Sequence, residues 1–142
     1  MKTFCFLMLS AILASTVPKH VFAEDGSPTT RAETLLTAVA KGQIDAGFDR
    51  FFEGSEIVKS KSQAVDLLKA QTKNALPLYG TVLSFEKVID KNYGSSITRL
   101  VYIVKMERHP LVWEFYFYKP TDHWKVSNVF FNDQFQGLRE GP

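Results

Sequence analysis

The spacing of apolar residues changes at Pro77, and this change constrains the fold more than any other feature of the chain. Before Pro77 the apolar residues recur at every third or fourth position, as on one face of an α-helix. After Pro77 they alternate with polar residues, as on a half-buried strand. Helices followed by strands predict an α+β fold, with three N-terminal helices packed on a curved four-stranded antiparallel sheet.

Capping and stop signals set the limits of the predicted helices. Thr30 and Glu33 have the spacing of a capping box, in which each side chain binds a free N–H of the first turn. Lys41-Gly42 is a typical helix end. A second helix is expected from Ile44 to Phe52, ending near Gly54. A third begins at the cap Ser60–Gln63 and runs toward Leu76, where Pro77 is expected to stop it.

Four alternating segments after Pro77 predict strands at residues 79–89, 97–107, 112–118 and 124–131. We place the tip of the middle hairpin between His109 and Pro110. One apolar face then pairs Met106 with Trp113, Val104 with Phe115 and Tyr102 with Phe117. On the opposite face Lys105 falls opposite Glu114, and this pairing of opposite charges favours the register.

The first 23 residues are typical of a secretory signal peptide, with a positive start, an apolar stretch and small residues at Val21-Phe22-Ala23. We predict cleavage after Ala23, a flexible lead-in over 24–28, a single domain over 29–133 and a loose tail over 134–142. The apolar stretch is shorter than the roughly 20 residues of a transmembrane helix, so no stable membrane insertion is expected. The processed chain is therefore expected in a bacterial envelope, periplasmic or secreted.

The predicted cleavage also changes the charge and the cysteine content. It removes Lys2 and Lys19, leaving 15 basic and 15 acidic residues and a net charge near zero. Basic residues are not clustered with stacking aromatics, so nothing favours nucleic-acid binding. The only cysteine, Cys5, lies in the leader, so no disulfide or thiolate metal site is expected. The chain shows no phosphate-binding loop and no metal-binding histidine spacing, and we expect no cofactor.

The order of elements, the Tyr79-Gly80 step before the first strand and the final segment 124–131 together resemble the nuclear-transport-factor-two-like superfamily, also called the cystatin-like α+β cone. The resemblance implies a pocket between the helices and the concave sheet face, and dimerisation through the other face. Members include lyases, isomerases and non-catalytic binding proteins, so the fold does not supply the function.

Candidate binding residues lie on both faces of the predicted sheet. Four aromatic residues on the inner face could line a ligand pocket or fill the core: Tyr102, Trp113, Phe115 and Phe117. Six outer residues form a strip that could be a homodimer interface: Val101, Ile103, Lys105, Glu114, Tyr116 and Tyr118. The alternative for this strip is that the chain's own tail covers it, through Phe135 and Leu138.

The sequence leaves three hypotheses open. The first is a non-catalytic exported module that binds a small apolar or amphipathic molecule in the cone, or a protein partner on the sheet. The second is a cofactor-independent lyase or isomerase in which Tyr102 polarises the substrate and Asp45 or Asp49 is the base. The third is a dimeric interaction protein with a packed interior. Further titratable candidates are Tyr79, and His109 and His123, both expected in exposed turns.

Overall fold

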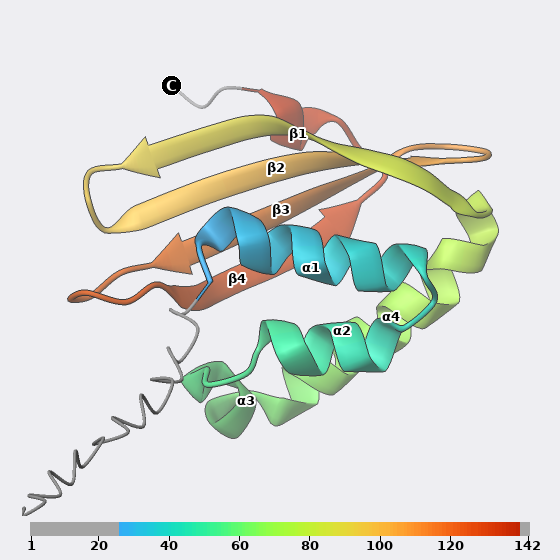
Figure 1. The fold of residues 1–142 in the computed structure, drawn as a ribbon. Coiled ribbons are helices and arrows are strands. Elements are labelled where there is room, and N and C mark those ends of the chain that lie inside the picture. Colours follow the sequence, from blue (N-terminus) through green and yellow to red (C-terminus); the bar gives the residue numbers. More distant parts are fainter. Residues whose placement is uncertain (1–25, 140–142) are drawn as a thin grey trace, which may run out of the picture.

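A computed structural model describes residues 26–139, so the predicted signal peptide, residues 1–23, lies outside the described residues. The α+β class is confirmed, with four antiparallel strands in one open sheet and helices beside it (Figure 1). The elements in chain order are α1 (Pro28–Ala40), α2 (Ile44–Phe51), α3 (Glu56–Ser60), α4 (Ser62–Tyr79), β1 (Val82–Tyr93), β2 (Ile97–Met106), β3 (Leu111–Tyr118), β4 (Lys125–Asn132) and a 3-10 turn, η1 (Gln136–Leu138).

The helices differ from the prediction in number and in their N-terminal caps. Between the second and third predicted helices lies the short helix α3, which Ser55 caps by accepting the Ile57 amide at 3.3 Å. Helix α1 begins earlier than the capping box suggested, because Ser27 is its N-cap and accepts the Thr30 amide at 3.2 Å. Pro28 suits the first helical position, where the missing N–H costs nothing.

Helix α4 runs through Pro77 to Tyr79 instead of stopping there, which corrects the prediction. A proline in a helix removes one N–H donor and weakens the last turn. The guanidinium of Arg108 stabilises this helix end in another way: its Nη1 donates to the carbonyl oxygens of Pro77 and Leu78, each at 3.3 Å. These carbonyls of the helix end therefore have partners, and Gly80 follows with a φ of +89°.

The sheet is a meander in the order β1-β2-β3-β4. Its middle hairpin pairs Tyr102 with Trp113 and Val104 with Leu111, so the predicted register was wrong by four residues. The turn is centred on Glu107 and Arg108 because both have partners outside the hairpin. Arg108 binds the end of α4, and Glu107 Oε2 accepts the Thr81 amide at 2.9 Å.

An even shift leaves every side chain on its predicted face, because side chains alternate along a strand. The inner face is thus the aromatic one that the sequence predicted, and it packs against α1 and α2. Only the cross-strand partners change. Lys105 does not face Glu114; its ammonium group lies 3.3 Å from Glu86 on β1. Glu114 forms its ion pair with Arg99 instead.

Candidate functional site

The four predicted ligand-binding side chains lie in the core of the protein, and each is fully buried. Trp113 stacks on Phe131 with ring centres 4.7 Å apart. Phe51, on α2, meets Phe115 at 5.6 Å and Phe117 at 6.0 Å, and Tyr102 meets Phe115 at 5.8 Å. Aromatic rings at these distances pack against one another as a hydrophobic core does. That these residues bind a ligand stays a prediction.

Tyr102 has a polar partner that the sequence reasoning did not foresee. Its hydroxyl donates to Glu33 Oε1 at 3.2 Å, joining β2 to α1. Burial, and then the charge of Glu33, raise the pKa of the Tyr102 hydroxyl well above its usual range. The capping-box pattern had placed Glu33 at the helix N-terminus. The signal that could have found its contact with the sheet is its position one helical turn before buried Leu36.

The predicted acid–base partners of Tyr102 are engaged elsewhere. Asp45 accepts from Lys73 Nζ and Asp49 from Lys69 Nζ, each at 2.6 Å, and both aspartates are exposed. These ion pairs link α2 to α4 on the solvent side of the helices. The structure therefore brings Tyr102 together with Glu33, and Asp45 and Asp49 with lysines.

Of the remaining titratable candidates, Tyr79 and His109 are neighbours, with ring centres 6.1 Å apart. Tyr79 donates to Asp133 at 3.0 Å, and this hydrogen bond is the main cause of the raised pKa of its hydroxyl. His109 is exposed in the β2–β3 turn and stacks on Phe135, with ring centres 5.8 Å apart. His123 is exposed in the β3–β4 turn. Within residues 26–139 no group of three or more His, Cys, Asp or Glu side chains could hold a metal ion.

The outer face of the sheet contains a buried ion pair. Arg99 Nε and Nη2 both lie 3.0 Å from Glu114 Oε2, and the two side chains are only 8% and 5% exposed. Tyr116 donates its hydroxyl to the same carboxylate oxygen at 3.2 Å. Val101 is also fully buried. Val101 and Glu114 therefore offer no exposed contact surface, and the predicted interface strip is smaller than expected.

A shallow hollow of about 510 Å³ lies at one corner of this outer face. We call its lining the outer patch: Ile97, Tyr116, Tyr118, Ser127, Asn128 and Phe130. Tyr118 is 46% exposed and Ile97 is 39% exposed, although both carry large apolar side chains. Of the predicted interface residues, Tyr116 and Tyr118 are in this patch, while Ile103 and Lys105 lie farther along β2.

The C-terminal segment covers the opposite end of the outer face. The turn η1 contacts β3, and Leu138 is partly buried. Phe135 stacks on His109 in the β2–β3 turn, whereas Ile97 and Tyr118 pair at the far end of the same two strands. Residues 135–138 therefore cover the end of the outer face near the β2–β3 turn, while Ile97 and Tyr118 of the outer patch stay exposed.

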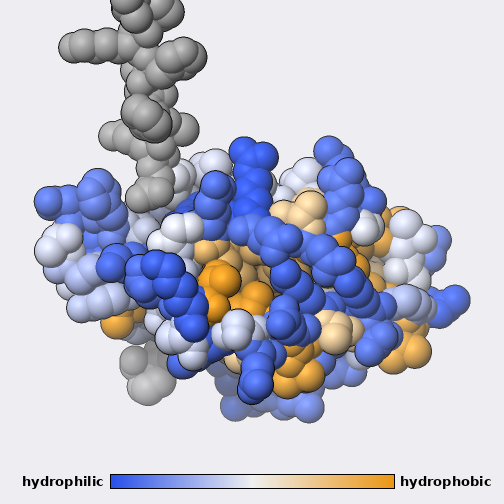
Figure 2. All heavy atoms as spheres, turned by 90° about the horizontal axis from the view of Figure 1, so that it is seen from below, coloured by the Kyte–Doolittle hydropathy of each residue, from blue (hydrophilic) through white to orange (hydrophobic). Residues whose placement is uncertain are grey.

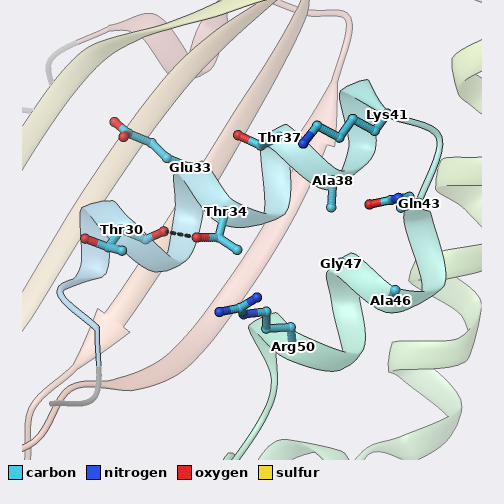
Figure 3. A pocket seen from close by; sticks show the side chains of 10 residues that line it. All are labelled: Thr30, Glu33, Thr34, Thr37, Ala38, Lys41, Gln43, Ala46, Gly47 and Arg50. Carbon is cyan, nitrogen blue, oxygen red and sulfur yellow. Dashed lines mark hydrogen bonds between the residues drawn. The ribbon is translucent and has the colours of Figure 1, made fainter. Parts of the chain in front are cut away.

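A polar groove of about 440 Å³ runs between α1 and α2 (Figure 3). Thr34 and Thr37 line it from α1, Arg50 reaches toward it from α2, and Lys41 lies at its other end. Figure 3 shows Glu33 on the side of α1 that faces the sheet, consistent with its bond to Tyr102. The groove can form hydrogen bonds and attract anions, but it holds neither Tyr102 nor the two aspartates.

These observations define an α+β protein with helices on one face of an open sheet and an exposed aromatic patch on the other. Comparison of the chain with models of protein families, with curated proteins and with solved structures found no match. In the part of the chain that the structure describes, none of the helices combines the length and apolar character needed to cross a bilayer.

Proposed function

We propose that the chain is a non-catalytic exported binding module whose outer patch pairs with a second copy of the chain. The observation that carries this proposal is the exposure of Ile97 and Tyr118 around a hollow on the sheet face opposite α1 and α2. Exposed apolar patches with a polar edge are typical of protein–protein contacts, where tyrosine and phenylalanine are enriched. Membership of the nuclear-transport-factor-two-like superfamily is part of the same proposal.

The chemistry of the patch favours a second copy as the partner. Its six lining residues are all uncharged, so two copies meet without like-charge repulsion. The Tyr118 hydroxyl and the amide of Asn128 can each donate and accept hydrogen bonds across a two-fold axis. The near-zero net charge after Ala23 also removes long-range repulsion between copies.

The contacts among the buried aromatic side chains favour a packed core over a ligand pocket in the interior. Tyr102, Trp113, Phe115 and Phe117 fill the space between sheet and helices with ring contacts, so we place the binding surface on the outer patch. The alternative of a lyase or isomerase using Tyr102 with Asp45 or Asp49 has no contact in its favour, because those three residues bind other partners.

Sedimentation velocity of the purified chain and of Tyr118→Glu tests the proposal. We expect a dimer for the unchanged chain and a folded monomer for Tyr118→Glu, because two facing carboxylates would repel. Tyr118 is a better choice than Tyr116, whose hydroxyl is bound to Glu114. The control is Leu83→Glu, an exposed residue at a β1 bulge outside the patch, which should stay dimeric. A monomeric unchanged chain, or a dimeric Tyr118→Glu, would overturn the proposal.

A further inference from the structure

A further concave site, separate from the outer patch and the α1–α2 groove, lies on the helical side of the molecule between α2, α3 and the start of α4. Its volume is about 340 Å³, within the usual range for small-molecule pockets. Buried Phe48, Phe52 and Val65 form its floor, and Val58, which is 41% exposed, forms an apolar wall. Figure 2 shows this side from below: hydrophobic surface is confined to small areas framed by hydrophilic side chains.

The rim of this pocket is acidic. Four carboxylates and two lysines line it: Asp49, Glu53, Glu56, Asp66, Lys59 and Lys69. Both lysines are already paired, Lys69 with Asp49 at 2.6 Å and Lys59 with Glu56 at 3.5 Å. Among residues 26–139 the carboxylates of Glu53 and Asp66 form no ion pair, so the rim has two acidic groups in excess.

A buried hydroxyl adds a polar group to the lining. Ser55 is 9% exposed, and its Oγ accepts the Ile57 amide at 3.3 Å as the N-cap of α3. A hydroxyl oxygen has two acceptor lone pairs, so Ser55 can accept a second N–H from a molecule in the pocket. Gly54, with a φ of +71°, makes the reversal between α2 and α3 that brings Ser55 to the pocket.

We propose that this pocket binds a small organic cation with an apolar body, such as an arylalkyl primary amine. The apolar part would lie on the Phe48, Phe52 and Val65 floor, and the ammonium group would meet the excess carboxylates. Charge complementarity selects this class, since an anion of the same shape would face net repulsion at the rim. The groove between α1 and α2 has the opposite bias, because Lys41 and Arg50 outnumber Glu33 there.

Titration calorimetry with phenylethylamine, and with phenylpropionate as its anionic counterpart, tests the proposal on the purified chain. We expect saturable binding of the amine and none of the carboxylate. The variant Glu53→Gln/Asp66→Asn should bind the amine at least about tenfold more weakly. The matched control Glu86→Gln/Asp122→Asn changes the net charge equally at exposed sites outside the lining, and should bind unchanged.

Backbone amide shifts locate the bound amine. We expect shifts at Val58 and Val65 as phenylethylamine is added. Absence of saturable binding, equally tight binding of the carboxylate, equal weakening in both double variants, or shifts confined to the α1–α2 groove would each overturn the proposal. The dimer proposal is independent, because the outer patch and this pocket share no residue.

Discussion

At the scale of single residues, Glu114 stands out because its charge is buried on the sheet face opposite the helices. Its Oε2 accepts from Arg99 at 3.0 Å and from Tyr116 at 3.2 Å, so one carboxylate oxygen binds both partners. A buried ion pair contributes little net stability, since the cost of removing both charges from water offsets their attraction. Removing one partner is different, because the remaining charge stays buried without its counterion.

We therefore expect Glu114→Gln to lower the free energy of unfolding by about 3 kcal/mol, measured by urea denaturation. The double variant Arg99→Leu/Glu114→Leu removes both charges and should lie within about 1 kcal/mol of the unchanged protein. A single variant as stable as the parent would show that the pair is better solvated than its 8% and 5% exposure indicates.

At the scale of elements, α1 and α2 are in unusually close contact at Gly47. A Cβ atom added there would lie 2.7 Å from the Cβ of Ala38 and 3.2 Å from Cδ1 of Leu35. Glycine inside a helix normally destabilises it relative to alanine. Here its missing side chain allows the close approach of the two helices that the Lys41-Gly42 turn connects.

The substitution Gly47→Ala sets two effects against each other. Alanine improves helix propensity by about 1 kcal/mol, whereas overpacking typically costs about 1–3 kcal/mol. Because the contact is backed by another helix, we expect overpacking to dominate and the midpoint of thermal unfolding to fall. Adding Ala38→Gly removes the closest contact, so the double variant should be more stable than the sum of its single effects predicts. Strict additivity would argue against the contact.

At the scale of the whole molecule, the hairpin register and the helix ends are the features that the sequence did not predict correctly. The inner and outer faces of β2 and β3 were predicted because alternation is a local property of the sequence. The register was not, because Glu107 and Arg108 are held by Thr81 and by the end of α4, which are distant in sequence. The same holds for the candidate sites. The outward position of Tyr118 was predicted from alternation, whereas the hydrogen bond between Tyr102 and Glu33, 69 residues apart, was not predicted.

Three tyrosines are expected to make the stability of the folded protein decrease at alkaline pH. Burial raises the pKa of Tyr102 and Tyr116, and the hydrogen bond to Asp133 raises that of Tyr79. Above pH ~10 the unfolded chain loses these protons while the folded chain keeps them. The contribution of these groups to the free energy of unfolding is therefore fully present below pH ~10. It is lost as the pH rises toward the folded-state pKa values.

We expect the urea midpoint to decrease steeply above pH ~10, in step with tyrosinate absorbance. Tyr102→Phe should flatten this decrease, because it removes one of the titrating groups. At neutral pH the same variant should cost only about 1 kcal/mol, the usual contribution of one hydrogen bond. An identical pH dependence in the variant would mean that Tyr102 does not contribute.

The sequence by itself determined the α+β class, the order of helices before strands and the inward faces of β2 and β3. These depend on the spacing of apolar residues within short segments of the chain. Only the tertiary structure decided the hairpin register, the continuation of α4 through Pro77, the Arg99–Glu114 pair and the pocket between α2, α3 and α4. Each of these depends on contacts between residues far apart in the chain, and local patterns carry no information about which distant groups will meet.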